Sequence, residues 1–247
     1  MSRNYELITQ LEIELGTREN RRKQPVDQAT RTTVAPILSS HISDAGGEEV
    51  LRLVQRIFLS GNGSAPRQVV LCGVDDANGS SSVCARAGRT LAANSSRPVC
   101  LVDANVRSPR LSRMFGIEGT NPFSGPSAPL RDQCVKVGAN LWIAGPNILA
   151  ENSQVLLPPT QLKERFVQLR DEFEYMLIDA PGTSVCADAQ LLGQIADAAI
   201  LVIDANSTRR LPARKAKDAF DAAGVRLLGT VLNNRTFAIP EAIYQRL

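Results

Sequence analysis

The sequence of 247 residues contains one histidine, His41, and five cysteines of which no two form a C-x-x-C pair. His41 lies in a polar stretch, so we expect neither a histidine-based catalytic triad nor a multi-histidine metal site. Scattered cysteines fit reduced thiols better than a disulfide framework. These two residue types therefore exclude several classes of enzyme and favour a protein of the cytoplasm.

Long apolar runs and a strong charge of either sign are also missing. No apolar run approaches the ~20 residues of a membrane-spanning helix, and the opening MSRNYELITQ does not have the pattern of a signal peptide. The formal net charge of +3 is too small to indicate a nucleic acid or a membrane surface as partner. With 43% hydrophobic and 21% charged residues, the chain is expected to be a cytosolic globular protein without a nucleic-acid partner.

The chain divides into two parts of different pattern. Apolar residues from Tyr5 to Leu15 are spaced as one face of a helix, and a polar, arginine-containing stretch follows. We therefore predict an N-terminal amphipathic helix and polar linker over residues 1–47, and one folded domain over residues 48–247. Docking of the helix on its own domain and docking on a partner or second copy both stay open.

The folded domain alternates apolar runs with helix-like stretches. Nearly continuous apolar runs are typical of parallel strands that are covered on both faces. The alternation predicts an α/β fold, a doubly wound and mostly parallel sheet with right-handed crossovers. Ligands of such folds bind beyond the carboxyl ends of the strands. The predicted strands cover residues 69–72, 98–103, 140–144, 175–180, 198–204 and 226–233, and the predicted helices cover residues 48–59, 83–92, 160–173, 187–195 and 211–223.

Residues 67–93, RQVVLCGVDDANGSSSVCARAGRTLAA, organise this domain. They have the pattern of a strand, a loop of small residues and a helix, in which backbone N–H groups and the helix N-terminus bind phosphate. Against the P-loop pattern G-x-x-x-x-G-K-[ST], Gly79 takes the last glycine and Ser81 the hydroxyl position. Ser80 stands in place of the lysine, and Val74 in place of the first glycine. As a motif alone, the match is weak.

Polar residues close three of the predicted strands: Asp103, Asp179 and Asn233. An aspartate at the end of an apolar strand is expensive to bury in a dry sheet, so each should face a solvated crevice or an ion. Two aspartates and a loop of small residues at one edge indicate an ancestral site for Mg²⁺ and a nucleotide. There Ser81 would bind Mg²⁺ directly and Asp179 through water, and Asp103 would polarise the attacking hydroxyl or hold a metal-bound water.

Four stretches, taken in order, resemble the bacterial tyrosine autokinases of polysaccharide synthesis and export, which belong to the deviant P-loop ATPases with the septum-positioning and plasmid-partition proteins. The stretches are ANGSSS, LVDANVRSPRLSRMFGIEG, LIDAPG and GTVLNN. The resemblance covers residues 48–247 and implies a P-loop NTPase fold that uses ATP or ADP with Mg²⁺. It places nucleotide contacts at Ala77, Asn78, Gly79, Ser80, Ser81, Ser82 and Asn233, metal contacts at Ser81, Asp103 and Asp179, and an oligomer contact at Glu49 and Arg52.

The chain departs from the family's pattern at positions that bear on catalysis. Ser80 replaces a lysine whose charge-assisted bonds to phosphate are worth roughly 1.5–3 kcal/mol each. Asn105 replaces the second aspartate of the family's D-x-D pair, so Asp103 and Asn105 form a degenerate catalytic pair. Arg86 and Arg89 are expected to be solvated rather than to replace the lysine. We therefore expect a crevice with two carboxylates and no cationic side chain to hold a phosphate tail.

The resemblance and these departures together suggest a degenerate kinase-like protein with weak nucleotide binding and impaired phosphoryl transfer. The expected role is regulation of exopolysaccharide or capsule synthesis or export. The implied partners are a membrane-anchored polysaccharide copolymerase, an active paralogous kinase or a second copy of the chain, which would place it at the inner membrane through the partner. Two alternatives stay open: an active ATP-dependent tyrosine kinase or ATPase, and a nucleotide-independent scaffold.

Overall fold

The computed structural model describes residues 44–59, 65–118, 129–152 and 154–235. The predicted N-terminal helix, with Tyr5, and the polar stretch with His41 lie outside the described residues, so the division at residue 47 stays a prediction. The helix expected from residue 48 begins earlier, as α2 (Asp44–Val54), and continues as a π-helical turn (Gln55–Leu59). None of the described helices is long and apolar enough to cross a membrane.

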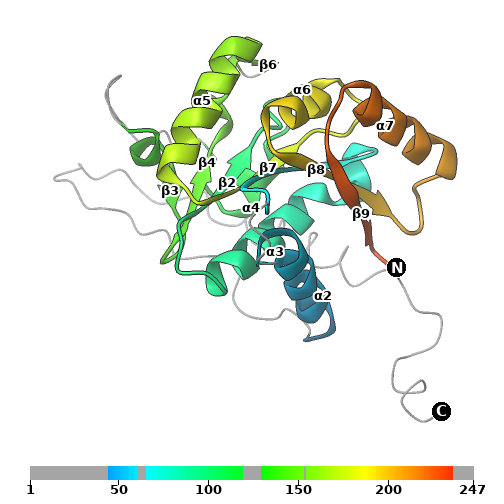
Figure 1. The fold of residues 1–247 in the computed structure, drawn as a ribbon, viewed down its shortest axis with the longest axis horizontal. Helices are drawn as coiled ribbons and strands as arrows, with labels where there is room; N and C mark the ends of the chain where they lie inside the picture. Colours follow the sequence, from blue (N-terminus) through cyan, green and yellow to red (C-terminus); the bar gives the residue numbers. More distant parts are fainter. Residues whose placement is uncertain (1–43, 60–64, 119–128, 153, 236–247) are drawn as a thin grey trace, which may run out of the picture. The chain divides into compact units, whose positions relative to one another are not determined.

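A seven-stranded sheet forms the centre of the fold (Figure 1), and its strand order is β3-β4-β2-β7-β1-β8-β9. All neighbouring strands are parallel except β3, which is antiparallel to β4. The mostly parallel, doubly wound sheet is therefore confirmed. The strands are β1 (Gln68–Gly73), β2 (Val99–Asp103), β3 (Val135–Lys136), β4 (Leu141–Ala144), β7 (Tyr175–Ala180), β8 (Ala198–Asp204) and β9 (Leu227–Asn233), and a separate hairpin pairs β5 (Ala150–Asn152) with β6 (Val155–Leu156).

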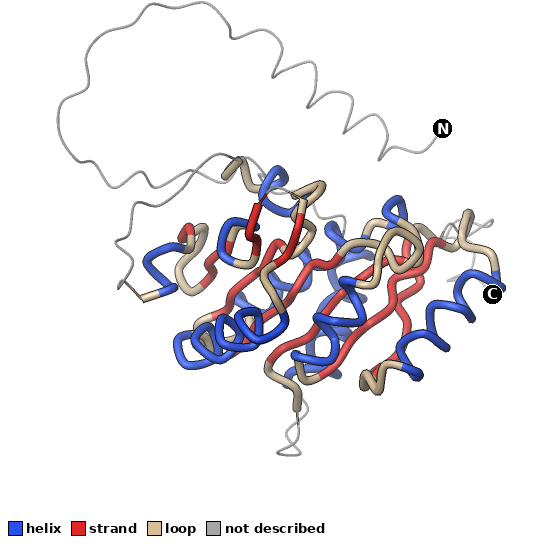
Figure 2. Tube along the Cα trace, turned by 90° about the horizontal axis from the view of Figure 1, so that it is seen from above, coloured by secondary structure: helices blue, strands red, loops and turns tan. Residues whose placement is uncertain are grey.

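Helices cover both faces of the sheet, as Figure 2 shows. Alternate side chains of the central strands belong to two separate apolar cores, because successive residues of a strand point to opposite faces. One core contains side chains of α5 (Pro159–Glu172), α6 (Asp188–Ile195) and α7 (Arg210–Ala222). The other contains side chains of α2, α3 (Ser80–Ala93) and α4 (Arg110–Met114).

Strand β1 and helix α3 hold the loop between them in a fixed position. Every residue of β1 is buried, and full burial of a large apolar side chain contributes about 1.5–3 kcal/mol. Helix α3 packs closely on the sheet at Gly88, where an added Cβ would lie 2.3 Å from a methyl group of Leu101 in β2. The loop is therefore anchored at both ends by elements that have little freedom to move.

Candidate functional site

The loop between β1 and α3 folds as a tight turn rather than a wide arc. Residues Asp76–Asn78 form one turn of 3₁₀ helix, and Gly79 follows with φ 77° and ψ 25°. Gly79 is the N-cap of α3, and its carbonyl oxygen accepts the first hydrogen bond of the helix from the Val83 N–H at 3.1 Å. A positive φ is unfavourable for other residues, which explains the glycine at this position. The N-terminus of α3 therefore begins at Ser80, with Ser80 and Ser81 buried and Ser82 exposed.

The two acidic residues of the loop bond to the connection between β7 and α6. Asp75 Oδ1 accepts a hydrogen bond from the Ser184 hydroxyl at 2.7 Å, and Asp76 Oδ1 accepts one from the Gly182 N–H at 2.9 Å. Gly182 fits closely, since an added Cβ would lie 2.8 Å from the Asp75 carbonyl carbon. These bonds satisfy one oxygen of each acid with protein donors.

Asn78 and Asn233 fasten the other side of the loop. Asn78 Oδ1 accepts from the Asp75 N–H at 2.7 Å, and Asn78 Nδ2 donates to the Thr208 hydroxyl at 3.1 Å. Asn233, at the end of β9, donates from Nδ2 to the Asn78 carbonyl oxygen at 3.0 Å. Two predicted nucleotide contacts are thus bonded to each other and to the sheet edge.

The two predicted carboxylates lie side by side. Asp103 and Asp179 are direct partners in the register of β2 and β7, and each side chain is 0% exposed. Asp103 Oδ2 accepts a hydrogen bond from the Ser112 N–H at 2.7 Å, so one of its oxygens caps the α4 segment. Within the described ranges, Asp103 Oδ1 and both oxygens of Asp179 have no hydrogen-bond partner. Buried carboxylate oxygens without partners are what a divalent cation would satisfy.

Burial shifts both acids toward their neutral forms. It raises the pKa of Asp179 to about 8, a rise that the nearby Ser81 and Ser80 hydroxyls oppose and the charge of Asp103 increases. The two hydroxyls lie near the carboxylate without completing a hydrogen bond of ordinary geometry. Burial also raises the pKa of Asp103, and the hydrogen bond from the Ser112 N–H acts in the opposite direction. Two adjacent acids with raised pKa values are typical of sites that hold a cation or a proton.

A guanidinium bonds to this loop, which corrects the expectation of a crevice without a cation. Arg110, the first residue of α4, donates from Nη1 to the Asp76 carbonyl oxygen at 2.5 Å. The arginine follows Pro109 in the connection after β2, whereas the arginines considered from the sequence as replacements for the lysine were Arg86 and Arg89. The sequence does offer a signal for Arg110, because it is the second basic residue of the stretch NVRSPR and this stretch lies close to the end of β2.

Comparisons with known proteins bear on this arrangement. No family model matches the chain. Tyrosine-protein kinase YwqD of Bacillus subtilis is 29% identical over 151 residues, which are 58% of this chain and 62% of YwqD. Tyrosine-protein kinase CpsD of Streptococcus agalactiae serotype III is 28% identical over 139 residues, which are 54% of this chain and 60% of CpsD. The chain thus spans about six tenths of the length of these curated relatives.

Its named homologues are bacterial tyrosine-protein kinases. The fold agrees with them. The chimerical protein CapA2B2 superposes with a TM-score of 0.64 and 22% identity, covering 79% of this chain and 87% of the chimera. The cell division ATPase MinD of Pyrococcus furiosus gives a TM-score of 0.53 and 20% identity, covering 73% of this chain and 79% of MinD. The tyrosine-kinase resemblance and the P-loop NTPase fold are therefore confirmed.

Four other residues named in the sequence analysis do not supply a side-chain oxygen or a cation to the buried carboxylates. Asn105 Oδ1 accepts a hydrogen bond from the Ser108 N–H at 3.2 Å and thereby closes a turn. Arg89 lies over the Phe115 ring at 4.7 Å and is half-buried rather than solvated. Glu49 and Arg52 are both exposed on α2, and Arg52 pairs with Glu48 at 2.7 Å.

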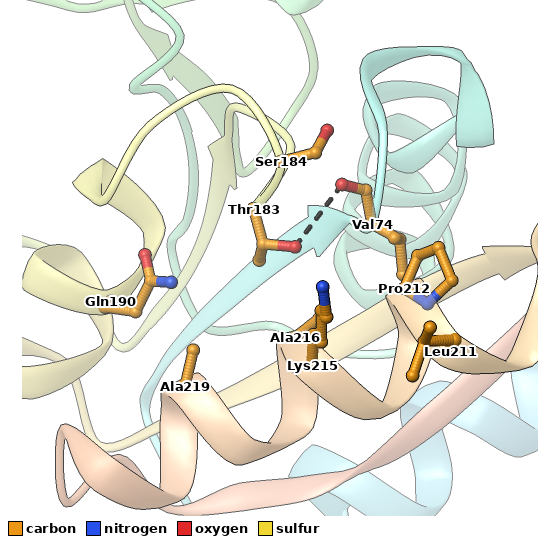
Figure 3. Close-up of a pocket in the computed structure, with 9 residues that line it drawn as sticks. All are labelled: Val74, Thr183, Ser184, Gln190, Leu211, Pro212, Lys215, Ala216 and Ala219. Atoms are coloured by element: carbon orange, nitrogen blue, oxygen red, sulfur yellow. Dashed lines mark hydrogen bonds between the residues drawn. The ribbon is translucent and has the colours of Figure 1, made fainter.

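A cavity of about 280 Å³ lies beside the loop (Figure 3). Val74 contributes to its wall, and the Thr183 hydroxyl, which also lines it, donates to the Val74 carbonyl oxygen at 3.3 Å. The remaining wall comes largely from α7, including Leu211 and Lys215. None of the nucleotide or metal contacts implied by the tyrosine-kinase resemblance lines this cavity, so it is separate from the carboxylate pair.

Proposed function

We propose that this chain is a tyrosine-autokinase-like protein that binds a magnesium–nucleotide weakly and is impaired in phosphoryl transfer. The observation that carries the proposal is the pair Asp103 and Asp179, buried and in register, with three carboxylate oxygens that no described protein group satisfies. They lie at the carboxyl edge of the sheet, together with the serines that begin α3. This is the edge at which doubly wound folds bind their ligands.

The side chains at this edge fit Mg²⁺. Among the described residues, no group of three or more histidine, cysteine or acidic side chains could hold a metal ion, so the carboxylate donors number two. Mg²⁺ is commonly held by one or two carboxylates together with water and substrate phosphates. Asp179, Asp103 and Ser81 would hold it, and the ion would neutralise charge on the phosphate groups.

Impaired transfer follows from Ser80. Removing one preorganised donor to transition-state charge slows a reaction on the order of 10²–10³-fold. The Ser80 hydroxyl carries no charge and lies close to the Asp179 carboxylate. Asn105 also bonds to the Ser108 backbone and carries no carboxylate that could act as a base. We therefore expect nucleotide binding to be retained although phosphoryl transfer is impaired.

The proposed role is regulation of exopolysaccharide or capsule synthesis or export. It comes from the tyrosine-kinase resemblance, and the likeness to the chimerical protein CapA2B2 supports a partner of the kind that such kinases have. That partner would be a membrane-anchored polysaccharide copolymerase or an active paralogous kinase, and it would bring the chain to the inner membrane. The exposed face of α2 with Glu49 and Arg52 is the proposed contact between copies.

Calorimetry combined with a kinase assay tests the proposal on the full chain. Mg²⁺–ADP should bind the wild type with micromolar to millimolar affinity. Asp179→Ala should lose this binding, and Asp171→Ala, at an exposed position of α5, should keep it. Incubation with Mg²⁺–ATP should leave no phosphotyrosine. Phosphotyrosine on the wild type would establish an active kinase and contradict the impaired transfer.

A nucleotide-independent scaffold is the second candidate, and one observation favours it. The loop already makes hydrogen bonds to other segments: the side chains of Asp75, Asp76 and Asn78 all have partners on neighbouring connections. Opening such a network for a ligand would cost roughly 0.5–1.5 kcal/mol per bond. Absence of any heat at millimolar Mg²⁺–ADP would decide for the scaffold.

A further inference from the structure

Arg110 reaches back from the start of α4 to the loop that precedes α3. Its Nη1 lies 2.5 Å from the Asp76 carbonyl oxygen, and the side chain is half-buried. Burial raises the pKa of Asp179, and the Arg110 charge is among the groups that oppose this rise. The guanidinium therefore acts on the loop and on the buried carboxylate from one position.

The groups near Arg110 favour ligands of both charges, a cation at the carboxylates and an anion at the N-terminus of α3. Both oxygens of Asp179 and Oδ1 of Asp103 are buried and have no partner among the described residues, which favours a cation beside them. Helix α3 begins at Ser80, and a helix N-terminus favours an anion. A magnesium ion with a phosphate group carries both charges. The loop itself contributes no cationic side chain between Gly73 and Ser82.

Three other arginines near this edge are engaged elsewhere. Each has its own partner, which is either an acid on another segment or an aromatic ring. Among the four, Arg110 is the one whose guanidinium bonds to the loop. The pairs are Arg107 with Asp188 at 3.0 Å, Arg113 with Glu118 at 2.9 Å, and Arg89 over the Phe115 ring at 4.7 Å.

We propose that Arg110 contacts the phosphate groups of a magnesium–nucleoside diphosphate and supplies the positive charge that Ser80 does not. This inference rests on the proposed nucleotide binding. A guanidinium has five N–H donors in one plane and binds phosphate oxygens in pairs, so the bond to Asp76 leaves donors for a ligand. The cation comes from the connection after β2 instead of from the loop.

Titration calorimetry of the full chain with Mg²⁺–ADP and with Mg²⁺–pyrophosphate tests this role. Arg110→Ala should weaken binding of both ligands on the order of 10-fold to 100-fold, the effect of one charge-assisted hydrogen bond. Arg165→Ala is the control, because Arg165 lies on α5 with its guanidinium on Gln168. Its affinities should equal those of the wild type.

Two further variants separate a phosphate contact from a brace for the loop. Arg110→Lys keeps the charge, and Arg110→Gln keeps a neutral donor for the Asp76 carbonyl oxygen. A phosphate contact predicts that the lysine variant binds more tightly than the glutamine variant, and less tightly than the wild type because an ammonium lacks the paired donors of the guanidinium. Equal affinities of these two variants, or of Arg110→Ala and the wild type, would overturn the role of Arg110 and leave nucleotide binding intact. A wild type that binds neither ligand would overturn both.

Discussion

Asp179 should make the folded protein less stable as the pH rises. Its side chain is 0% exposed, and burial raises its pKa from 3.8 to about 8, with Ser81 opposing the rise and Asp103 adding to it. Between these two values the folded state holds a proton that the unfolded state has released. Stability therefore falls with increasing pH across this window, and the full penalty is present above about pH 8.

The size of the penalty follows from the shift. At 1.36 kcal/mol for each pKa unit, a shift of about four units corresponds to roughly 4–6 kcal/mol. Asp179→Asn has nearly the same shape and removes the charge, but its amide donors would lack partners, which costs about 1–3 kcal/mol. The variant should thus be more stable than the wild type by roughly 1–5 kcal/mol at pH 8.5, and it should lose this advantage at pH 5.

Urea unfolding at pH 5, 7 and 8.5 measures this difference. The midpoint of Asp179→Asn should exceed that of the wild type increasingly from pH 5 to pH 8.5, with an unchanged denaturant slope. Asp171→Asn, an exposed substitution on α5, is the control and should change stability by less than about 0.5 kcal/mol at each pH. A variant that is less stable than the wild type at pH 8.5, or a pH profile parallel to that of the wild type, would refute this reasoning.

Two other predictions concern the loop. Gly79→Ala places a Cβ 2.5 Å from Asn233 Nδ2 at a backbone φ of 77°, so it should destabilise the fold by about 2 kcal/mol and lower the Tm by roughly 4–8 °C in a thermal melt. An unchanged Tm would mean that the turn differs from the one described. Ser80→Lys combined with Ala77→Gly should raise Mg²⁺–ADP affinity on the order of 10-fold in calorimetry, and an unchanged affinity would mean that the rest of the site cannot bind phosphate.

The central sheet could be predicted from the sequence because its signal is local. The apolar runs that became β1, β2, β4, β7 and β8 are largely buried strands whose length and composition allow few other structures. The run that became β9 is also a strand, but it lies at the edge of the sheet and is partly exposed rather than covered on both faces. Gly224 follows α7 with φ 67°, as expected of a residue that ends a helix. The strand-end position of Asp103 and Asp179 placed them together, because parallel strands in register bring their carboxyl ends to one edge.

The missed features depend on contacts between distant parts of the chain. Strand β3 has two residues and is defined by its pairing with β4, so it is too short to be predicted from hydrophobic periodicity. The 3₁₀ turn of the loop depends on bonds to Gly182, Ser184 and Thr208, which lie far along the sequence. Arg110 belongs to the same class, because its bond to Asp76 follows from the path of the chain after β2.

The dependence of ADP affinity on Mg²⁺ tests most directly whether the buried carboxylates form a cation site. Calorimetry should give wild-type ADP binding that is tighter by about 10-fold or more with Mg²⁺ than with EDTA. Asp179→Asn, although more stable at pH 8.5, should show no such gain. Equal wild-type affinities in Mg²⁺ and EDTA, or a Mg²⁺ gain that survives in Asp179→Asn, would contradict a magnesium–nucleotide site at this edge of the sheet.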